Sequence, residues 1–336
     1  MREYRDPAGG PGTPLGQLPP AGNLGLKCGM ATLSIRFLTL AFAVCGAALL
    51  SPALAQDLGT LNPQPLPPLA KPDDPSTPAK DLFGRKPKPA SMAARSIGYY
   101  TSGCLAGGVA LPINGETWQV MRLSRNRNWG HPNLIKFLER FAAQARKVGW
   151  NGLLVGDMAQ PRGGPMLTGH WSHQVGLDAD LWLTPMPDRE LTPAEREETM
   201  ATNVVAEDWK DVNPQIWSPT HIALLKAAAS NPEVERVLVN PAIKKALCRD
   251  VKEDRGWLAK MRPVYGHNYH FHIRIRCPGD NPECKAQPAV PGSDGCGKEL
   301  DWWFTEQALA PKTGGKREPL KMSALPATCR QVLVSP

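Results

Sequence analysis

Five of the chain's seven histidines lie in or just before two short segments that are far apart along the chain, and both segments read as β-strands. His170 and His173 precede the first strand, and His267 precedes the second. Residues 177–183 (LDADLWL) alternate apolar and polar side chains, so Asp178 and Asp180 share the face opposite the leucines. Residues 270–277 (HFHIRIRC) alternate in the same way, which places two histidines on one face. These two strands and the residues just before them therefore carry the candidate chemistry of the chain.

A metal site is the chemistry that this pattern predicts. Several imidazoles with one carboxylate are what Zn²⁺ binds while leaving a position for water. The candidate residues are His170, His173, Asp180, His267, His270 and His272. A single histidine in a strand is more often packed or solvated, so the prediction depends on the clustering. His131 and His221 lie apart from the cluster and are interpreted as structural, and Asp178 as a carboxylate beside the site or in solvent.

The N-terminal part reads as a targeting sequence. Residues 30–55 combine Arg36, an apolar run and the small-residue site Ala53-Leu54-Ala55, which is typical of a secretory signal peptide. Residues 1–29 precede a good start at Met30 and are interpreted as a leader or a misassigned start. The apolar run is short for a membrane span, so we expect an exported chain without a stable span after cleavage, located in the periplasm.

Export changes the interpretation of the cysteines. Of the eight, two leave with the leader, and an even number in an exported protein predicts three disulfides with fifteen pairings open. The six are Cys104, Cys248, Cys277, Cys284, Cys296 and Cys329. A zinc knuckle is the alternative, but the chain has no CxxC pair.

The sequence of residues 56–336 predicts one α+β domain. Residues 56–95 are rich in proline and read as a linker or surface strap, and 96–336 as the folded domain. Helices are predicted at 133–148, from Ser218 through Ala229 and at 241–249, with further strands at 152–155 and 234–239. Without a βαβ rhythm, these elements favour a central, mostly antiparallel sheet that carries the zinc site, with flanking helices.

The charge of the chain limits the classes of binding partner that the sequence predicts. The formal net charge is +8, and no run of Lys or Arg is interleaved with aromatic residues, so the sequence predicts no nucleic-acid partner. Arg162, in the PRGG turn at 161–164 before the histidines, is a candidate contact for a substrate carboxylate or an oxyanion.

Joint motifs resemble the penicillin-insensitive murein endopeptidases, within the zinc peptidases that share the lysostaphin, D-Ala-D-Ala carboxypeptidase and hedgehog type of fold. The resemblance covers roughly 96–329. It rests on SIGYYTSGC at 96–104, PRGG at 161–164, GHWSHQVGLDADLWL at 169–183, VNPQIW at 212–217, VNPAIKKALC at 239–248, GHNYHFHIRIRCP at 266–278 and PGSDGCG at 291–297.

The resemblance implies roles for individual residues. His173, Asp180 and His272 would hold the catalytic zinc, with His270 as general base and His267 as its auxiliary. His170, Asp208 and Asp211 would be further metal ligands, so a second ion is possible. The family pattern has a histidine where this chain has Asp211. The implied disulfides are Cys104 with Cys329, Cys248 with Cys296, and Cys277 with Cys284.

The implied activity is hydrolysis of the D-alanyl to meso-diaminopimelyl cross-bridge of peptidoglycan. The chain has no Ser-x-x-Lys, the motif of the serine that β-lactams acylate, so we expect insensitivity to penicillin and sensitivity to chelators. Two alternatives stay open: a D,D- or L,D-carboxypeptidase that trims uncrosslinked stems, and a murein-binding zinc module without activity.

Overall fold

The structure is a computed structural model that describes residues 58–310 and 318–336. The predicted leader and signal peptide lie outside the described residues. The described helices are α1 (Ala79–Phe83), α2 (Pro132–Lys147), α3 (Pro193–Glu198), α4 (Pro219–Ser230), α5 (Pro241–Asp250), α6 (Lys298–Asp301), α7 (Glu306–Leu309) and α8 (Thr328–Val334). The described strands are β1 (Arg95–Tyr99), β2 (Ser102–Ala106), β3 (Val109–Ala110), β4 (Asn114–Gly115), β5 (Trp118–Val120), β6 (Trp129–Gly130), β7 (Leu153–Val155), β8 (Asp178–Pro185), β9 (Val234–Val239), β10 (Met261–Pro263) and β11 (His270–Ile275). None of the described helices is long and apolar enough to cross a membrane.

Seven strands form one sheet, in the order β10-β9-β11-β8-β7-β5-β4. The pairs β5–β7 and β10–β9 are parallel, and the others are antiparallel. The α+β class is therefore confirmed, but the sheet is mixed, which corrects the prediction of a mostly antiparallel one. A parallel pair needs a long crossover, and here α2 precedes β7 and α5 precedes β10. The sequence did not predict β5 and β10, because each strand is only three residues long and too short to show a period.

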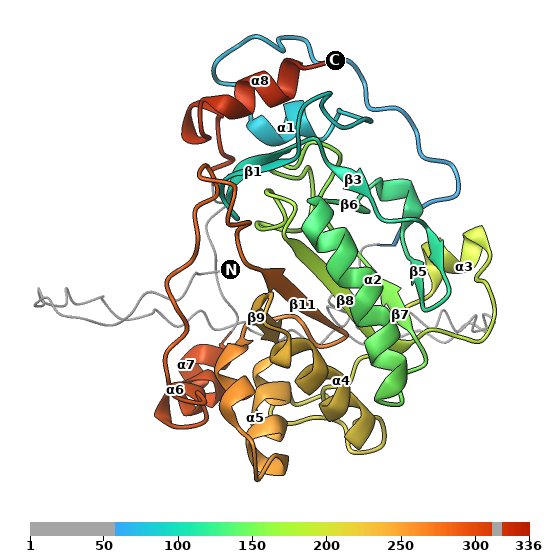
Figure 1. The fold of residues 1–336 in the computed structure, drawn as a ribbon, viewed down its shortest axis with the longest axis vertical. Coiled ribbons are helices and arrows are strands. Elements are labelled where there is room, and N and C mark those ends of the chain that lie inside the picture. The colour runs from blue at the N-terminus through green and yellow to red at the C-terminus, as the bar shows by residue number, and fades with distance from the viewer. Residues whose placement is uncertain (1–57, 311–317) are drawn as a thin grey trace, which may run out of the picture. The chain divides into compact units, whose positions relative to one another are not determined.

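The main core lies between the sheet and two helices. Alternation turns the apolar side chains of β8 and β11 toward one face, where they join the buried side chains of α2 and α4 in one cluster. Figure 1 shows α2 and α4 on this side of the strands. The opposite face of β8 and β11 therefore carries their aspartates and histidines, away from the helices.

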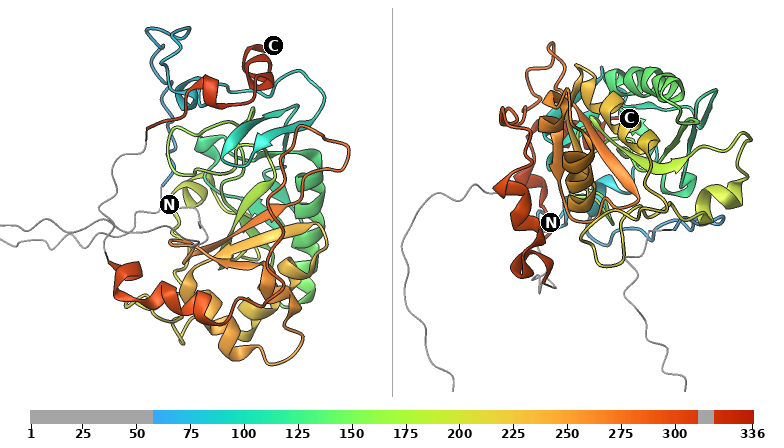
Figure 2. Two further views of the ribbon diagram at one scale, coloured as in Figure 1. Left: turned by 90° about the vertical axis from the view of Figure 1, so that its left-hand side faces the viewer. Right: turned by 90° about the horizontal axis from the view of Figure 1, so that it is seen from below.

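A second, smaller core joins the two ends of the described chain. It combines Ala79 and Phe83 of α1 with Ile97 and Cys104 of the β1–β2 hairpin and Val332 of α8. The Ala79 N–H donates to Leu320 O at 2.8 Å. Figures 1 and 2 show α8 and α1 close together in different views. The Cys104–Cys329 disulfide lies in this core and ties the C-terminal tail to the hairpin.

The described part of the chain contains three disulfides, as the sequence predicts. They join Cys104 to Cys329, Cys248 to Cys296 and Cys277 to Cys284, which are the pairs that the resemblance implies. The first links residues 225 positions apart and closes most of the domain.

Candidate metal centre

The polar faces of β8 and β11 meet at the centre of the sheet. In their antiparallel register His272 lies opposite Asp180, and His270 lies opposite Trp182. His272 Nδ1 is 3.1 Å from Asp180 Oδ1, and His270 Nε2 is 3.7 Å from Asp180 Oδ2. The two strands that the sequence singled out are therefore neighbours, and their histidines share one carboxylate.

The loop before β8 brings two more imidazoles to Asp180. His173 Nε2 lies 3.4 Å from Asp180 Oδ1, and His170 Nδ1 lies 3.4 Å from Asp180 Oδ2. Gln174 fixes this loop, because its side chain donates to Thr101 O at 3.0 Å and accepts from the Gly103 N–H at 3.1 Å. His173 has a φ of +66°, in the left-handed region that non-glycine residues rarely adopt.

The donor atoms of this cluster suit a metal ion. Both ring nitrogens of His173, Asp180 Oδ1 and His270 Nδ1 are buried without a hydrogen-bond partner among the described residues. Buried polar atoms are normally paired, so such a concentration needs a partner from outside the chain. One ligand atom each from His170, His173 and Asp180 lie within 4.8 Å of one another. His272 lies next to this group, because His272 Nδ1 and His173 Nε2 both lie close to Asp180 Oδ1.

Burial and charge divide the imidazoles into two groups. Burial lowers the pKa of His173, and it lowers the pKa of His270 to about 4, so His270 is neutral at pH 7. Burial also acts to lower the pKa values of His170 and His272, but nearby carboxylates outweigh this effect and raise both values. At Asp180 burial favours the neutral form, but the surrounding histidines hold its pKa well below the usual range.

His267 lies beside His270 at the edge of the cluster. The ring centroids of the two residues are 4.8 Å apart. His267 Nδ1 donates to Tyr265 O at 3.1 Å, and the residue has a φ of +52°. Burial holds the pKa of His267 well below its ordinary value, so this imidazole is neutral as well. The structure thus brings five of the predicted histidines together around Asp180.

Asp157, which the sequence reasoning missed, supports His170. Its Oδ2 accepts from His170 Nε2 at 3.0 Å, from Arg125 at 2.9 Å and from Arg127 at 2.8 Å. Burial favours a neutral Asp157, but His170 and the two guanidinium groups lower its pKa. Arg127 also donates to Thr168 O at 3.0 Å in the histidine loop. The one sequence signal was a carboxylate two residues after the buried strand β7.

Asp178 lies on the other side of His272. Its Oδ1 accepts from His272 Nε2 at 3.0 Å and from Arg274 Nε at 2.6 Å, and its Oδ2 accepts from the His173 N–H at 3.0 Å. Burial favours a neutral Asp178, but Arg274 and His272 lower its pKa. Asp178 is therefore a buried ionised carboxylate that touches two members of the cluster.

The two acidic candidates from the following loop have other surroundings. Asp208 is exposed and accepts from the Lys210 N–H at 2.9 Å. Asp211 accepts from Arg249 through both carboxylate oxygens at 2.8 Å, and Lys245 lies 3.3 Å away. Neither residue belongs to the group of ligand atoms around Asp180.

Arg162 is buried and contacts the C-terminal part of the chain. Its Nε donates to Lys88 O at 3.0 Å, and one terminal nitrogen donates to Val332 O at 2.8 Å, Leu333 O at 2.9 Å and Ser335 O at 2.6 Å. The described structure thus gives this guanidinium four carbonyl partners, three of them at the end of α8 and one at Lys88.

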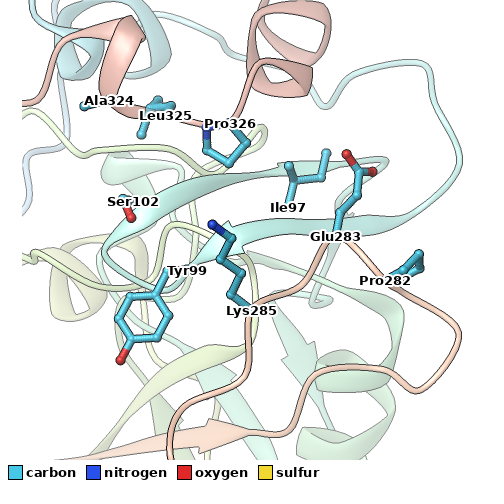
Figure 3. A pocket seen from close by; sticks show the side chains of 9 residues that line it. All are labelled: Ile97, Tyr99, Ser102, Pro282, Glu283, Lys285, Ala324, Leu325 and Pro326. Atoms are coloured by element: carbon cyan, nitrogen blue, oxygen red, sulfur yellow. The ribbon is translucent and has the colours of Figure 1, made fainter.

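A cavity of about 470 Å³ lies beside the β1–β2 hairpin, apart from the histidine cluster. Figure 3 shows the side chains that line it, among them Tyr99, Ser102, Lys285 and Pro326. The turn of this hairpin contacts the histidine loop, because the Gln174 side chain donates to Thr101 O. None of the cluster's histidines lines the cavity.

The donor set of this α+β fold could hold a metal ion, as the active site of a metal-dependent hydrolase requires. Residues 96–334 match the family model described as penicillin-insensitive murein endopeptidase. A penicillin-insensitive murein endopeptidase of Haemophilus influenzae is 46% identical over 244 residues, which cover 72% of this chain and 84% of the relative. One of Escherichia coli strain 55989 is 42% identical over 248 residues, which cover 73% and 88%. The chain belongs to this family of metallopeptidases, which confirms the resemblance.

Proposed function

We propose that this chain is a zinc-dependent endopeptidase that hydrolyses D-alanyl to meso-diaminopimelyl cross-links in peptidoglycan. The observation that carries the proposal is the convergence of the β8 and β11 histidines on Asp180, in a chain of the murein endopeptidase family. Family membership supports the substrate, and the buried unpaired donors support the metal.

His173, Asp180 and His272 are the residues that would hold the zinc. His173 Nε2 and His272 Nδ1 both lie within 3.4 Å of Asp180 Oδ1, so their lone pairs point toward one small region. Two imidazoles and one carboxylate form a common donor set for a catalytic zinc with an open position. A bound zinc ion supplies Lewis acidity, which polarises the scissile carbonyl and makes water a better nucleophile.

His270 is the proposed general base and later acid. Because burial lowers its pKa to about 4, it is neutral at pH 7 and has a free lone pair to take a proton from the attacking water. It then returns that proton to the leaving amine, so water is added across the amide bond in balance. His267 packs against His270 and supports the orientation of its ring. No covalent acyl-enzyme is needed, which accounts for the proposed insensitivity to β-lactams.

One metal ion is sufficient for this proposal. His170 approaches Asp180 with one ring nitrogen but contacts Asp157 with the other. Asp211 is already paired with Arg249 and Lys245, so its carboxylate charge is balanced by the chain itself. We therefore assign no second ion to Asp208 and Asp211, and the departure from the family pattern at Asp211 is consistent with this assignment.

The location proposed is the periplasm, where the cross-linked substrate lies. The support is the signal-like sequence of residues 30–55, with the mature chain beginning near Gln56. Three disulfides agree with an oxidising compartment.

Purified residues 56–336, incubated with isolated dimeric and monomeric muropeptides, test the proposal. We expect dimers to become monomers, activity to disappear with a chelator and to return with added zinc, and penicillin to have no effect. Products are identified by mass. If only monomers lose a residue, the chain is a carboxypeptidase instead. If zinc binds and neither substrate changes, it is a murein-binding module.

A further inference from the structure

We propose that Asp178 is a positioning residue that aims both His272 and His173 at the metal position, a role that rests on the proposed function. Asp178 is fully buried on β8, two residues before Asp180. Its carboxylate has three partners, two of which belong to the proposed zinc ligands. No other described carboxylate outside the ligand set contacts both of them.

The first contact selects the ring nitrogen of His272 that faces the metal position. His272 Nε2 lies 3.0 Å from Asp178 Oδ1, while Nδ1 lies 3.1 Å from Asp180 Oδ1 on the other side of the ring. An ionised carboxylate only accepts hydrogen bonds, so Nε2 carries the hydrogen toward Asp178. The lone pair for a metal is then on Nδ1. Such a carboxylate partner fixes both the tautomer and the ring orientation of a histidine ligand.

The second contact holds the backbone of His173. The His173 N–H donates to Asp178 Oδ2 at 3.0 Å. His173 has a φ of +66°, which an L-residue with a side chain adopts only when its surroundings enforce it. The two oxygens of one carboxylate thus fix one ligand through its side chain and the other through its main chain.

Arg274 fixes Asp178 in turn. The two residues are cross-strand partners in the β8–β11 pair, and Arg274 Nε donates to Asp178 Oδ1 at 2.6 Å. The guanidinium lies over the Tyr100 ring, 3.5 Å from its centroid, and donates to the Gln287 side chain at 2.8 Å. This cation balances the buried negative charge, so Asp178 can stay ionised without taking a proton from a zinc ligand.

Asp294 provides a matched control within the same chain. Its carboxylate accepts from Arg255 at 2.9 and 2.7 Å and from the Cys296 N–H at 3.0 Å. The pattern of one arginine and one backbone N–H is the one seen at Asp178, but no histidine is part of it. The Asp294 side chain is 33% exposed, so this control tests the loss of an arginine–carboxylate pair and not its burial. A loss that follows only from removing such a pair should therefore appear in both variants.

The experiment compares Asp178→Asn, Asp178→Glu and Asp294→Asn in residues 56–336. Zinc affinity is measured by competition with a chromogenic chelator, and ligand geometry by the visible spectrum of the cobalt-substituted protein. We expect Asp178→Asn to lower zinc affinity by about 10–100-fold and to change the cobalt spectrum. Asp178→Glu should recover part of the affinity, and Asp294→Asn should match the wild type in both measurements.

Each result has a defined meaning. If folded Asp178→Asn keeps wild-type zinc affinity and cobalt spectrum, the positioning role is wrong, although the proposed peptidase function is untouched. If the wild type binds no zinc, the proposed function fails first. If Asp178→Asn does not fold, Arg274→Lys decides, because it keeps the carboxylate but removes the Nε donor. A several-fold loss of zinc affinity in Arg274→Lys supports the role, and unchanged affinity overturns it.

Discussion

The histidine cluster and the Arg162 site are both buried and polar, but their hydrogen bonds differ. Arg162 donates to four carbonyls of its own chain, at Lys88, Val332, Leu333 and Ser335. In the cluster, by contrast, both ring nitrogens of His173 and Asp180 Oδ1 lack a hydrogen-bond partner among the described residues. The chain itself satisfies the Arg162 guanidinium, whereas these donor atoms of the cluster stay free for a ligand.

This difference in hydrogen bonding also separates residues that stabilise the fold from residues that carry the proposed chemistry. The last carbonyls of a helix have no partner within the helix, and Arg162 supplies one to the end of α8. The cluster's unpaired atoms instead lower the stability of the metal-free protein, because they are desolvated without compensation. Substitutions in the two regions should therefore separate loss of activity from loss of stability.

His270→Ala should have the largest effect. Removing the proposed base lowers kcat for dimeric muropeptide by about 10²–10⁴-fold, since general base catalysis contributes that much. Zinc content should stay at the wild-type level, because His270 is not a proposed ligand. Steady-state kinetics and elemental analysis measure the two quantities, with His221→Gln as a histidine control outside the cluster. A kcat within tenfold of the wild type would contradict the role of His270.

Loss of the Cys104–Cys329 disulfide should affect stability alone. The double serine variant is expected to lower the free energy of unfolding by about 2–4 kcal/mol, because the bond closes a long loop. Denaturant unfolding measures this loss, and kcat per folded molecule should not change. The Cys277–Cys284 pair is the control, since these residues are seven positions apart and their loop entropy is smaller. An equal loss from both pairs would contradict the loop argument.

Arg162→Met tests the comparison most directly. It should lower the free energy of unfolding by about 1–3 kcal/mol, because buried carbonyls at the end of α8 lose their donor. The KM for dimeric muropeptide should stay near the wild-type value. A raised KM at unchanged stability would instead establish the substrate contact that the sequence predicted for Arg162.

The smallest effect concerns pH and a histidine that the chain itself satisfies. His221 Nδ1 accepts from the Ser218 N–H at 3.2 Å, and burial lowers the His221 pKa from 6.5. Below pH 6.5 the unfolded chain therefore binds a proton that the folded chain does not, and stability falls as the pH falls. His221→Gln should flatten this slope between pH 6.5 and the lowered pKa. Unfolding curves across that interval measure the slope, and an identical slope in the variant would exclude a contribution from His221.

Local sequence patterns were enough to predict the main secondary-structure elements and which strand faces carry the site. The predicted strand at 234–239 has the bounds of β9, and the predicted helix at 133–148 is α2 shifted by one residue at each end. Alternation placed Asp180 and the HxH histidines on polar faces, which the register of β8 and β11 brings together. The periodicity of apolar residues is a local property, so it can be read from a segment without knowing which other segments that segment packs against.

The pairing of polar side chains, in contrast, depends on the folded chain. Asp178 and His272 are 94 residues apart, and nothing in either segment indicates that one orients the other. The partners of Asp157, Arg162 and Asp211 are equally remote in sequence, and the parallel edges of the sheet depend on strands too short to show a period. These contacts are set by how the whole chain closes on itself, because side-chain pairing requires proximity in space rather than in sequence.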